Sequence, residues 1–208
     1  MNKARPLTLA VMAAVLASTT LSACAPVIVG GAVAGTLAAS DRRTFGAQTE
    51  DKAIVMKAEV KMRNVVDKYS HINVNSFNRR VLITGEVPDE ATKARVEQEV
   101  RGVEGVVNVT NELELGPPAS YTSRSNDTLI TSKVKLSLAD AKDISANSFK
   151  VITERGAVFL MGRVTQREGA QATDIARGVS GVTKVVKVFE YISEEEWKQY
   201  QPVPEPKA

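Results

Sequence analysis

Two segments of the chain repeat each other on either side of a Gly-Pro-Pro break at residues 116–118. INVNSFNRRVLITGEV from Ile72 matches FKVITERGAVFLMGRV from Phe149, and RGVEGVVNV from Arg101 matches RGVSGVTKV from Arg177. A repeat at this spacing indicates two structural units of about 60 residues each, since every copy must bury its own apolar face. The sequence therefore predicts two small domains with one fold.

Within each copy, the spacing of apolar residues predicts the same order of elements. Each copy opens on a helical spacing: Ile54, Ala58, Val65 and Tyr69, then Ile130, Val134, Leu138 and Ala141. Alternating residues predict a hairpin next, and Pro88-Asp89-Glu90 suits the first turn of a second helix before a last strand. The predicted unit is helix–strand–strand–helix–strand. Its class is α+β, with two helices on one face of a three-stranded mixed sheet.

Gly85 and Gly162 occupy the same place in the two copies, late in the second predicted strand. A glycine inside a strand weakens it unless another backbone or a helix must come close. We therefore predict packing positions at both glycines. The alternative is a bulge without consequence.

The first 23 residues read as a secretory signal that ends directly before Cys24, the only cysteine. Lys3 and Arg5 precede an apolar run from Leu7 to Ala17, and small residues lead to the cleavage site. The pattern resembles a bacterial lipobox, which implies that Cys24 carries acyl chains such as palmitate. The alternative is an ordinary signal peptide with an accidental cysteine. Ala25, in place of an aspartate that would resemble an inner-membrane retention signal, favours the outer membrane.

Composition excludes several classes of function. Removing 23 of 208 residues leaves 185, and loss of Lys3 and Arg5 lowers the formal charge from +3 to +1. Overall basicity therefore gives no reason to expect a nucleic-acid partner. With Cys24 acylated, no thiol is left for a disulfide, a zinc site or a nucleophile. His71 is the single histidine, and no phosphate-binding loop, cofactor motif or metal-ligand cluster is evident. An enzyme is the weakest interpretation, and we expect His71 to be structural or exposed.

The repeated unit resembles the BON domain, and the chain as a whole resembles the dual-BON outer-membrane lipoproteins. The motifs that carry the resemblance are Ser125-Asn126-Asp127-Thr128, Val158-Phe159-Leu160-Met161-Gly162 and Val179-Ser180-Gly181-Val182. On this basis we divide the chain as follows: signal peptide 1–23, lipidated N-terminus and linker 24–48, first BON domain 49–116, linker 117–124, second BON domain 125–192, and C-terminal extension 193–208.

The resemblance implies a periplasm-facing protein that maintains the cell envelope and is not an enzyme. It implies that the second domain binds anionic phospholipid through its first helix, and it links the family to cell-division sites and to outer-membrane barrel assembly. A protein–protein adaptor is therefore the alternative function. Leu129 stands where the family has a tryptophan, directly after Ser-Asn-Asp-Thr. The C-terminal extension lies beyond the family's usual end.

We expect the lipid-binding helix to run from Asp127, as its N-cap, to about Ala139. Leu129, Lys133 and Leu136 form a second stripe beside the core stripe, and an apolar pair flanking a lysine suits a headgroup layer. Arg124 and Lys135 add attraction to anionic lipid. The alternative is that this second stripe widens the core stripe or contacts the other domain.

In the extension, Trp197 and Tyr200 follow three acidic residues. We favour a short helix docked on a BON domain. An aromatic membrane contact is the alternative.

Overall fold

The computed structural model describes residues 41–63, 65–66 and 69–200. The predicted signal peptide and Cys24 lie outside the described residues. Among the helices that are described, none is both long and apolar enough to cross a bilayer.

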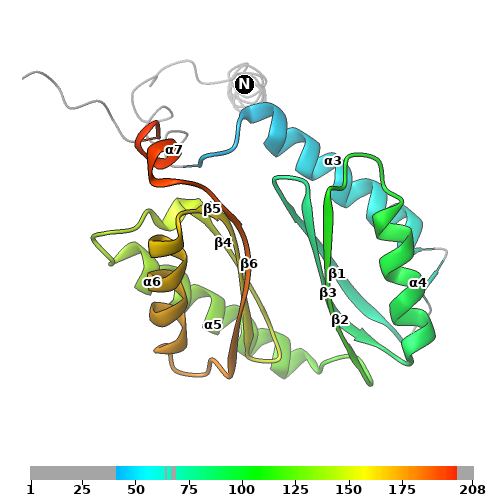
Figure 1. Cartoon of the computed structure of the whole chain (residues 1–208). Helices are drawn as coiled ribbons and strands as arrows, with labels where there is room; N and C mark the ends of the chain where they lie inside the picture. Colours follow the sequence, from blue (N-terminus) through cyan, green and yellow to red (C-terminus); the bar gives the residue numbers. More distant parts are fainter. Residues whose placement is uncertain (1–40, 64, 67–68, 201–208) are drawn as a thin grey trace, which may run out of the picture. The chain divides into compact units, whose positions relative to one another are not determined.

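The first domain has the predicted order of elements. Helix α3 (Phe45–Met62) precedes the hairpin of β1 (His71–Phe77) and β2 (Arg80–Val87), and helix α4 (Glu90–Arg101) leads to β3 (Asn108–Leu115). β2 lies between an antiparallel β1 and a parallel β3, so the sheet is mixed. Figure 1 shows α3 and α4 on one face of this sheet.

The second domain repeats this arrangement. Its elements are α5 (Tyr121–Ala139), the 3-10 turn η2 (Ala146–Ser148), β4 (Phe149–Glu154), β5 (Ala157–Val164), α6 (Gln166–Arg177), β6 (Lys184–Tyr191) and the short α7 (Glu194–Lys198). The strand order is β4-β5-β6, with β4 antiparallel and β6 parallel to β5. Helices α5 and α6 lie on one face of this sheet (Figure 1). The predicted α+β class, with two copies of one unit, is confirmed.

Strand alternation divides the buried residues between two faces of each sheet. In β2, Val81 and Ile83 pack with the helices of the first domain, whereas Leu82 points to the opposite face. There Leu82 joins Phe77 and three residues of the second sheet in a third apolar cluster; the three are Phe159, Met161 and Val188. The central strands are therefore buried on both faces.

At Gly85 and Gly162 the backbone of a neighbouring segment comes too close for a side chain. A Cβ on Gly85 would collide with the carbonyl oxygen of His71, and the residue has a φ of +118°. A Cβ on Gly162 would lie 2.6 Å from the carbonyl oxygen of Ser148. His71 is the first residue of β1, and Ser148 directly precedes β4, so the two copies make this contact at nearly the same place.

The helix boundaries differ from the predicted ones. α5 begins at Tyr121, because the side chain of Ser120 accepts a hydrogen bond from the Ser123 N–H at 3.2 Å and caps the helix. Residues 121–124 of the predicted linker thus form the first turn of α5. α3 likewise begins at Phe45, inside the linker predicted up to residue 48, and ends at Met62. Val65 and Tyr69 lie beyond it.

Asp127 is not a helix cap but a buried link between α5 and the β4–β5 turn. Its carboxylate accepts the backbone N–H groups of Arg155 at 2.9 Å and Gly156 at 2.8 Å. Asp51 on α3 does the same for Asn78 and Arg79, both at 2.8 Å. The tight turns leave these donors without a ladder partner, so a carboxylate from the covering helix satisfies them.

Candidate membrane-binding surface

The outer face of α5 carries two exposed leucines. Leu129 is 61% and Leu136 66% exposed, whereas Ile130 and Leu138 are each 1% exposed. Lys133 is also exposed and lies on the same flank of the helix. The alternative of a widened core stripe, or of a contact with the other domain, is therefore wrong. The second stripe meets solvent.

Tyr121 adds an aromatic side chain to this outer face. It is 89% exposed, and its position eight residues before Leu129 places it within about a quarter turn on a helix of 3.6 residues per turn. Amphipathic aromatic rings of this kind favour the headgroup level of a bilayer. The sequence interpretation missed Tyr121 because it placed residues 117–124 in a linker. The Ser120 cap after two prolines was the signal that could have found it.

Arg124 and Lys135 lie on the other flank of α5, between about a quarter and two fifths of a turn from the leucines. Both line a cleft together with Thr131 of the same helix, Thr153 of β4 and His71 of β1. The three residues predicted as a stripe thus form an exposed apolar and basic face. Arg124 and Lys135, predicted to add attraction to anionic lipid, line a polar cleft beside it.

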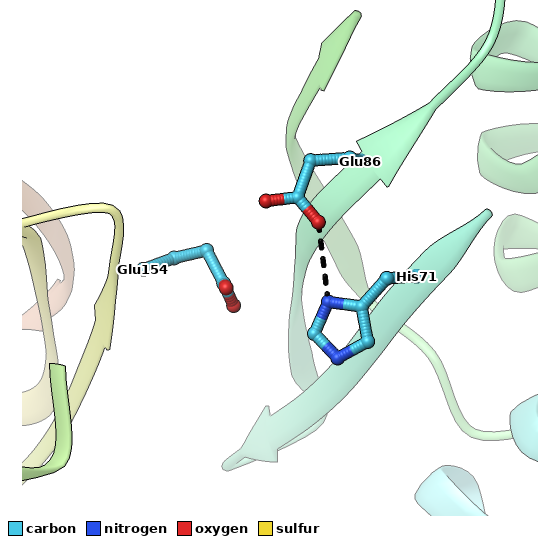
Figure 2. Close-up of side chains that lie close together, drawn as sticks. All are labelled: His71, Glu86 and Glu154. Atoms are coloured by element: carbon cyan, nitrogen blue, oxygen red, sulfur yellow. Dashed lines mark hydrogen bonds and ion pairs between the residues drawn. The ribbon is translucent and has the colours of Figure 1, made fainter. Parts of the chain in front are cut away.

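His71, Glu86 and Glu154 bring ligand-type atoms within 4.8 Å of one another. Figure 2 shows the His71 ring beside the Glu86 carboxylate, Nδ1 to Oε2 at 3.3 Å, and Glu154 pointing toward both. The other Glu86 oxygen accepts from Arg155 Nε at 2.7 Å, and Glu154 accepts from Asn73 at 2.9 Å. Burial raises the pKa of Glu154, against the hydrogen bond from Asn73.

These residue types bind divalent cations, but both Glu86 oxygens already have protein partners. We interpret the cluster as a polar network between the two domains, which agrees with a structural His71. The sequence interpretation missed it because the two carboxylates come from different copies of the repeat.

A second buried network surrounds Glu168, at the start of α6. The Arg42 guanidinium donates to both carboxylate oxygens at 2.8 and 2.6 Å, and Trp197 Nε1 donates at 2.8 Å. Burial raises the pKa of Glu168, but the hydrogen bonds from Arg42, Thr165 and Trp197 outweigh it and hold that pKa below its ordinary value. Trp197 is therefore docked on the second domain, as favoured from the sequence.

The neighbouring Arg43 pairs instead with Asp51 of the first domain at 2.9 Å. Two consecutive arginines just before α3 thus bind the two domains. Neither was singled out in the sequence, because nothing in a run of Asp41, Arg42 and Arg43 indicates which carboxylates it meets.

A family model described as the BON domain matches residues 52–117 and 126–193. The outer membrane lipoprotein DolP of Haemophilus influenzae (strain ATCC 51907 / DSM 11121 / KW20 / Rd) is 39% identical over 178 residues, which cover 83% of this chain and 90% of that protein. A 21 kDa hemolysin of Actinobacillus pleuropneumoniae is 31% identical over a region that covers 73% of this chain and 79% of the hemolysin. The osmotically-inducible protein Y of Escherichia coli (strain K12) is 29% identical over a region that covers 73% of this chain and 78% of that protein.

Proposed function

The chain belongs to the BON-domain family, and on that premise we propose that it is an outer-membrane lipoprotein that binds anionic phospholipid through α5 and so supports the integrity of the cell envelope. Its action is binding rather than catalysis. Cys24 holds it at the membrane, facing the periplasm.

The observation that carries the proposal is the exposure of Leu129 and Leu136 beside Lys133 on one helix face. Burying one leucine side chain contributes about 1.5 to 3 kcal/mol. A lysine near an anionic surface adds about 1 kcal/mol. Tyr121 supplies an amphipathic ring at the start of the same face. These groups match a headgroup layer, where apolar side chains enter and lysines meet phosphates.

The lipid anchor fits this scheme because it reduces the affinity that α5 needs. A tethered domain is present at a high effective concentration near the surface that holds its tether. Binding through two leucines and a few cations is then sufficient. We expect the helix to set how the domains lie on the membrane, while the acyl chains keep the protein there.

Co-sedimentation with lipid vesicles tests the proposal. Both helix-facing cores are formed by residues between Ile54 and Phe189, so the chain from Ala25 to Ala208 keeps them without the acylated cysteine. We expect it to sediment with vesicles of phosphatidylcholine mixed with phosphatidylglycerol and to stay in solution with phosphatidylcholine alone. Equal behaviour toward the two vesicles would contradict the proposal.

A protein–protein adaptor for barrel assembly or cell division is the second candidate function. It is favoured by apolar surface on another helix: Met56 and Val60 of α3 are 67% and 59% exposed and border a groove with Val103. Cells carrying Met56→Glu or Leu129→Glu separate the two functions by their sensitivity to detergent. Lipid binding expects Leu129→Glu to sensitise the cells, whereas an adaptor acting through α3 expects Met56→Glu to do so.

A further inference from the structure

We propose that the polar cleft on the flank of α5 binds a phosphate ester, with Arg124 as its direct ligand. The inference rests on the proposed function, which supplies phospholipid headgroups as the natural source of this group. The cleft is lined by Arg124, Thr131, Ser132, Lys135, Thr153 and His71, among others. It adjoins the exposed face of α5, so a lipid could place its phosphate in the cleft and its chains toward the leucines.

The Arg124 side chain has a hydrogen-bond donor without an acceptor among the described residues. Its Nε is buried and makes no hydrogen bond within the described part of the chain. A buried donor without an acceptor is costly, and more so when it belongs to a charged group. The planar guanidinium presents paired N–H groups that fit two oxygens of a phosphate. The Tyr121 ring, with its centroid 5.9 Å from the guanidinium carbon, flanks the same group.

The cleft offers a second donor between α5 and β4. The hydroxyls of Thr131 and Thr153 are hydrogen-bonded to each other at 2.7 Å. This bond uses one of the two hydroxyl protons, so the other remains free to donate to a ligand.

Lys135 lines the far end of the cleft. It lies eleven residues after Arg124, which is about three turns and about 16 Å along the helix. Its side chain is exposed. At that distance its contribution is attraction rather than shared contact with one phosphate.

Two carboxylates in the cleft oppose an anion, and they make the proposal testable in both directions. Asp127 is occupied by the N–H groups of the β4–β5 turn. Glu154 accepts from the Asn73 side chain at 2.9 Å, and no other side-chain partner for it is found among the described residues. Glu154→Gln keeps an acceptor for Asn73 and removes the negative charge. We therefore expect this substitution to strengthen phosphate binding, whereas loss of Arg124 weakens it.

The direct test follows the Arg124 Nε–Hε resonance by proton–nitrogen NMR in the chain from Ala25 to Ala208. The two probes are sn-glycerol 3-phosphate in solution and vesicles of phosphatidylcholine mixed with phosphatidylglycerol. A saturable downfield shift with the soluble ester supports a phosphate site that is independent of a bilayer. A change only with the vesicles supports a site that takes the phosphate from lipid. No change with either probe overturns the proposal.

Affinity for the vesicles provides the matched comparison among variants that keep the wild-type circular dichroism spectrum. We expect Arg124→Gln to weaken binding about tenfold or more, since it removes charged hydrogen bonds. Arg124→Lys should be intermediate, and Lys133→Gln, on the other flank, should lose about fivefold at most. Arg177→Gln, an equal loss of charge on α6, should stay near wild type.

If Arg124→Gln, Lys133→Gln and Arg177→Gln lose the same affinity for vesicles, the loss reflects the overall charge of the protein. That result would overturn the proposed phosphate site in the cleft. Weaker binding by Glu154→Gln would also overturn it. If Leu129→Glu abolishes vesicle binding while Arg124→Gln does not differ from Arg177→Gln, the proposed function stands and the phosphate site fails. If the wild-type chain binds no vesicles but glycerol 3-phosphate shifts the Arg124 resonance, the phosphate site stands and the lipid function fails.

Discussion

Arg155, in the β4–β5 turn of the second BON domain, donates from Nε to the buried carboxylate of Glu86 in the first domain at 2.7 Å. The Glu86 side chain is fully buried, whereas that of Arg155 is 36% exposed. The second Glu86 oxygen faces His71. A buried carboxylate needs such partners because an unpaired charge in a low-dielectric interior is strongly unfavourable.

Arg155→Ala should therefore lower the free energy of unfolding by about 1 to 3 kcal/mol, because it leaves the buried Glu86 short of a charged partner. The partial exposure of Arg155 keeps the expected loss at this level rather than higher. The urea midpoint of the chain from Ala25 measures it. Arg177→Ala, which breaks an exposed pair with Asp174, is the control and should change little. Equal midpoints for both variants would show that the Glu86 pair is dispensable.

Gly85→Ala and Gly162→Ala should both lower Tm, since each Cβ would press on a backbone carbonyl oxygen, that of His71 or of Ser148. Overpacking costs about 1 to 3 kcal/mol. Gly85→Ala should be the worse of the two because its φ of +118° adds backbone strain of the order of 1 kcal/mol. Gly116→Ala is the control for strain alone, since that residue has a φ of +147° and no atom within 4 Å of an added Cβ. A loss at Gly162 no larger than at Gly116 would argue against close packing there.

Leu129→Glu should weaken binding to anionic vesicles about tenfold or more, because it removes an inserted leucine and brings a negative charge to the surface. Folding should be retained, since Ile130, Val134 and Leu138 still fill the core. Leu129→Trp should strengthen binding by adding an interfacial aromatic ring. Leu115→Glu, at an exposed leucine of β3, is the matched control. A folded Leu129→Glu chain that binds like wild type would remove α5 from the proposal.

Salt should weaken the electrostatic part of this binding, because exposed charges are screened over about 10 Å at 0.1 M. The part supplied by Leu129 and Leu136 should persist. Co-sedimentation across a salt series separates the two contributions.

Cys24→Ala should abolish lipidation and release the protein from the outer membrane in cell fractionation. The reason is chemical: Cys24 is the only cysteine and the only thiol available for acylation. Persistence in the outer-membrane fraction after a high-salt wash would contradict the anchor.

Acid should release α7, and Trp197 reports it because it is the only tryptophan of the chain. The pKa of Glu168 is lowered in the folded protein, so its contribution is present above the ordinary value of 4.5 and is lost as pH falls through the folded pKa. Arg42→Ala removes a group that lowers this pKa. We expect the red shift of tryptophan emission to occur at higher pH in that variant than in wild type. An unchanged transition would mean that Glu168 does not control the docking of Trp197.

The sequence by itself determined the two α+β units, the two core stripes and the positions of Gly85 and Gly162. Each of these follows from residues that are close together in the chain and that recur in both copies of the repeat. Periodicity and repetition were therefore sufficient to predict them. It also placed Leu129, Lys133 and Leu136 on one flank, because the angle between residues of a helix is fixed by their spacing. Whether that flank is exposed depends on which other elements pack around the helix. The spacing of residues along one helix does not determine this.

Tertiary structure alone decided what the charged side chains do. Asp127 was expected to cap a helix, but it binds a turn that lies 28 and 29 residues later. Arg155 meets Glu86 across 69 residues, and Arg42 meets Glu168 across 126. A carboxylate accepts equally well from a helix end, a turn or a guanidinium, so its sequence neighbours do not fix its partner. The partner is the donor that folding leaves buried beside it, and only the packed chain specifies which donor that is.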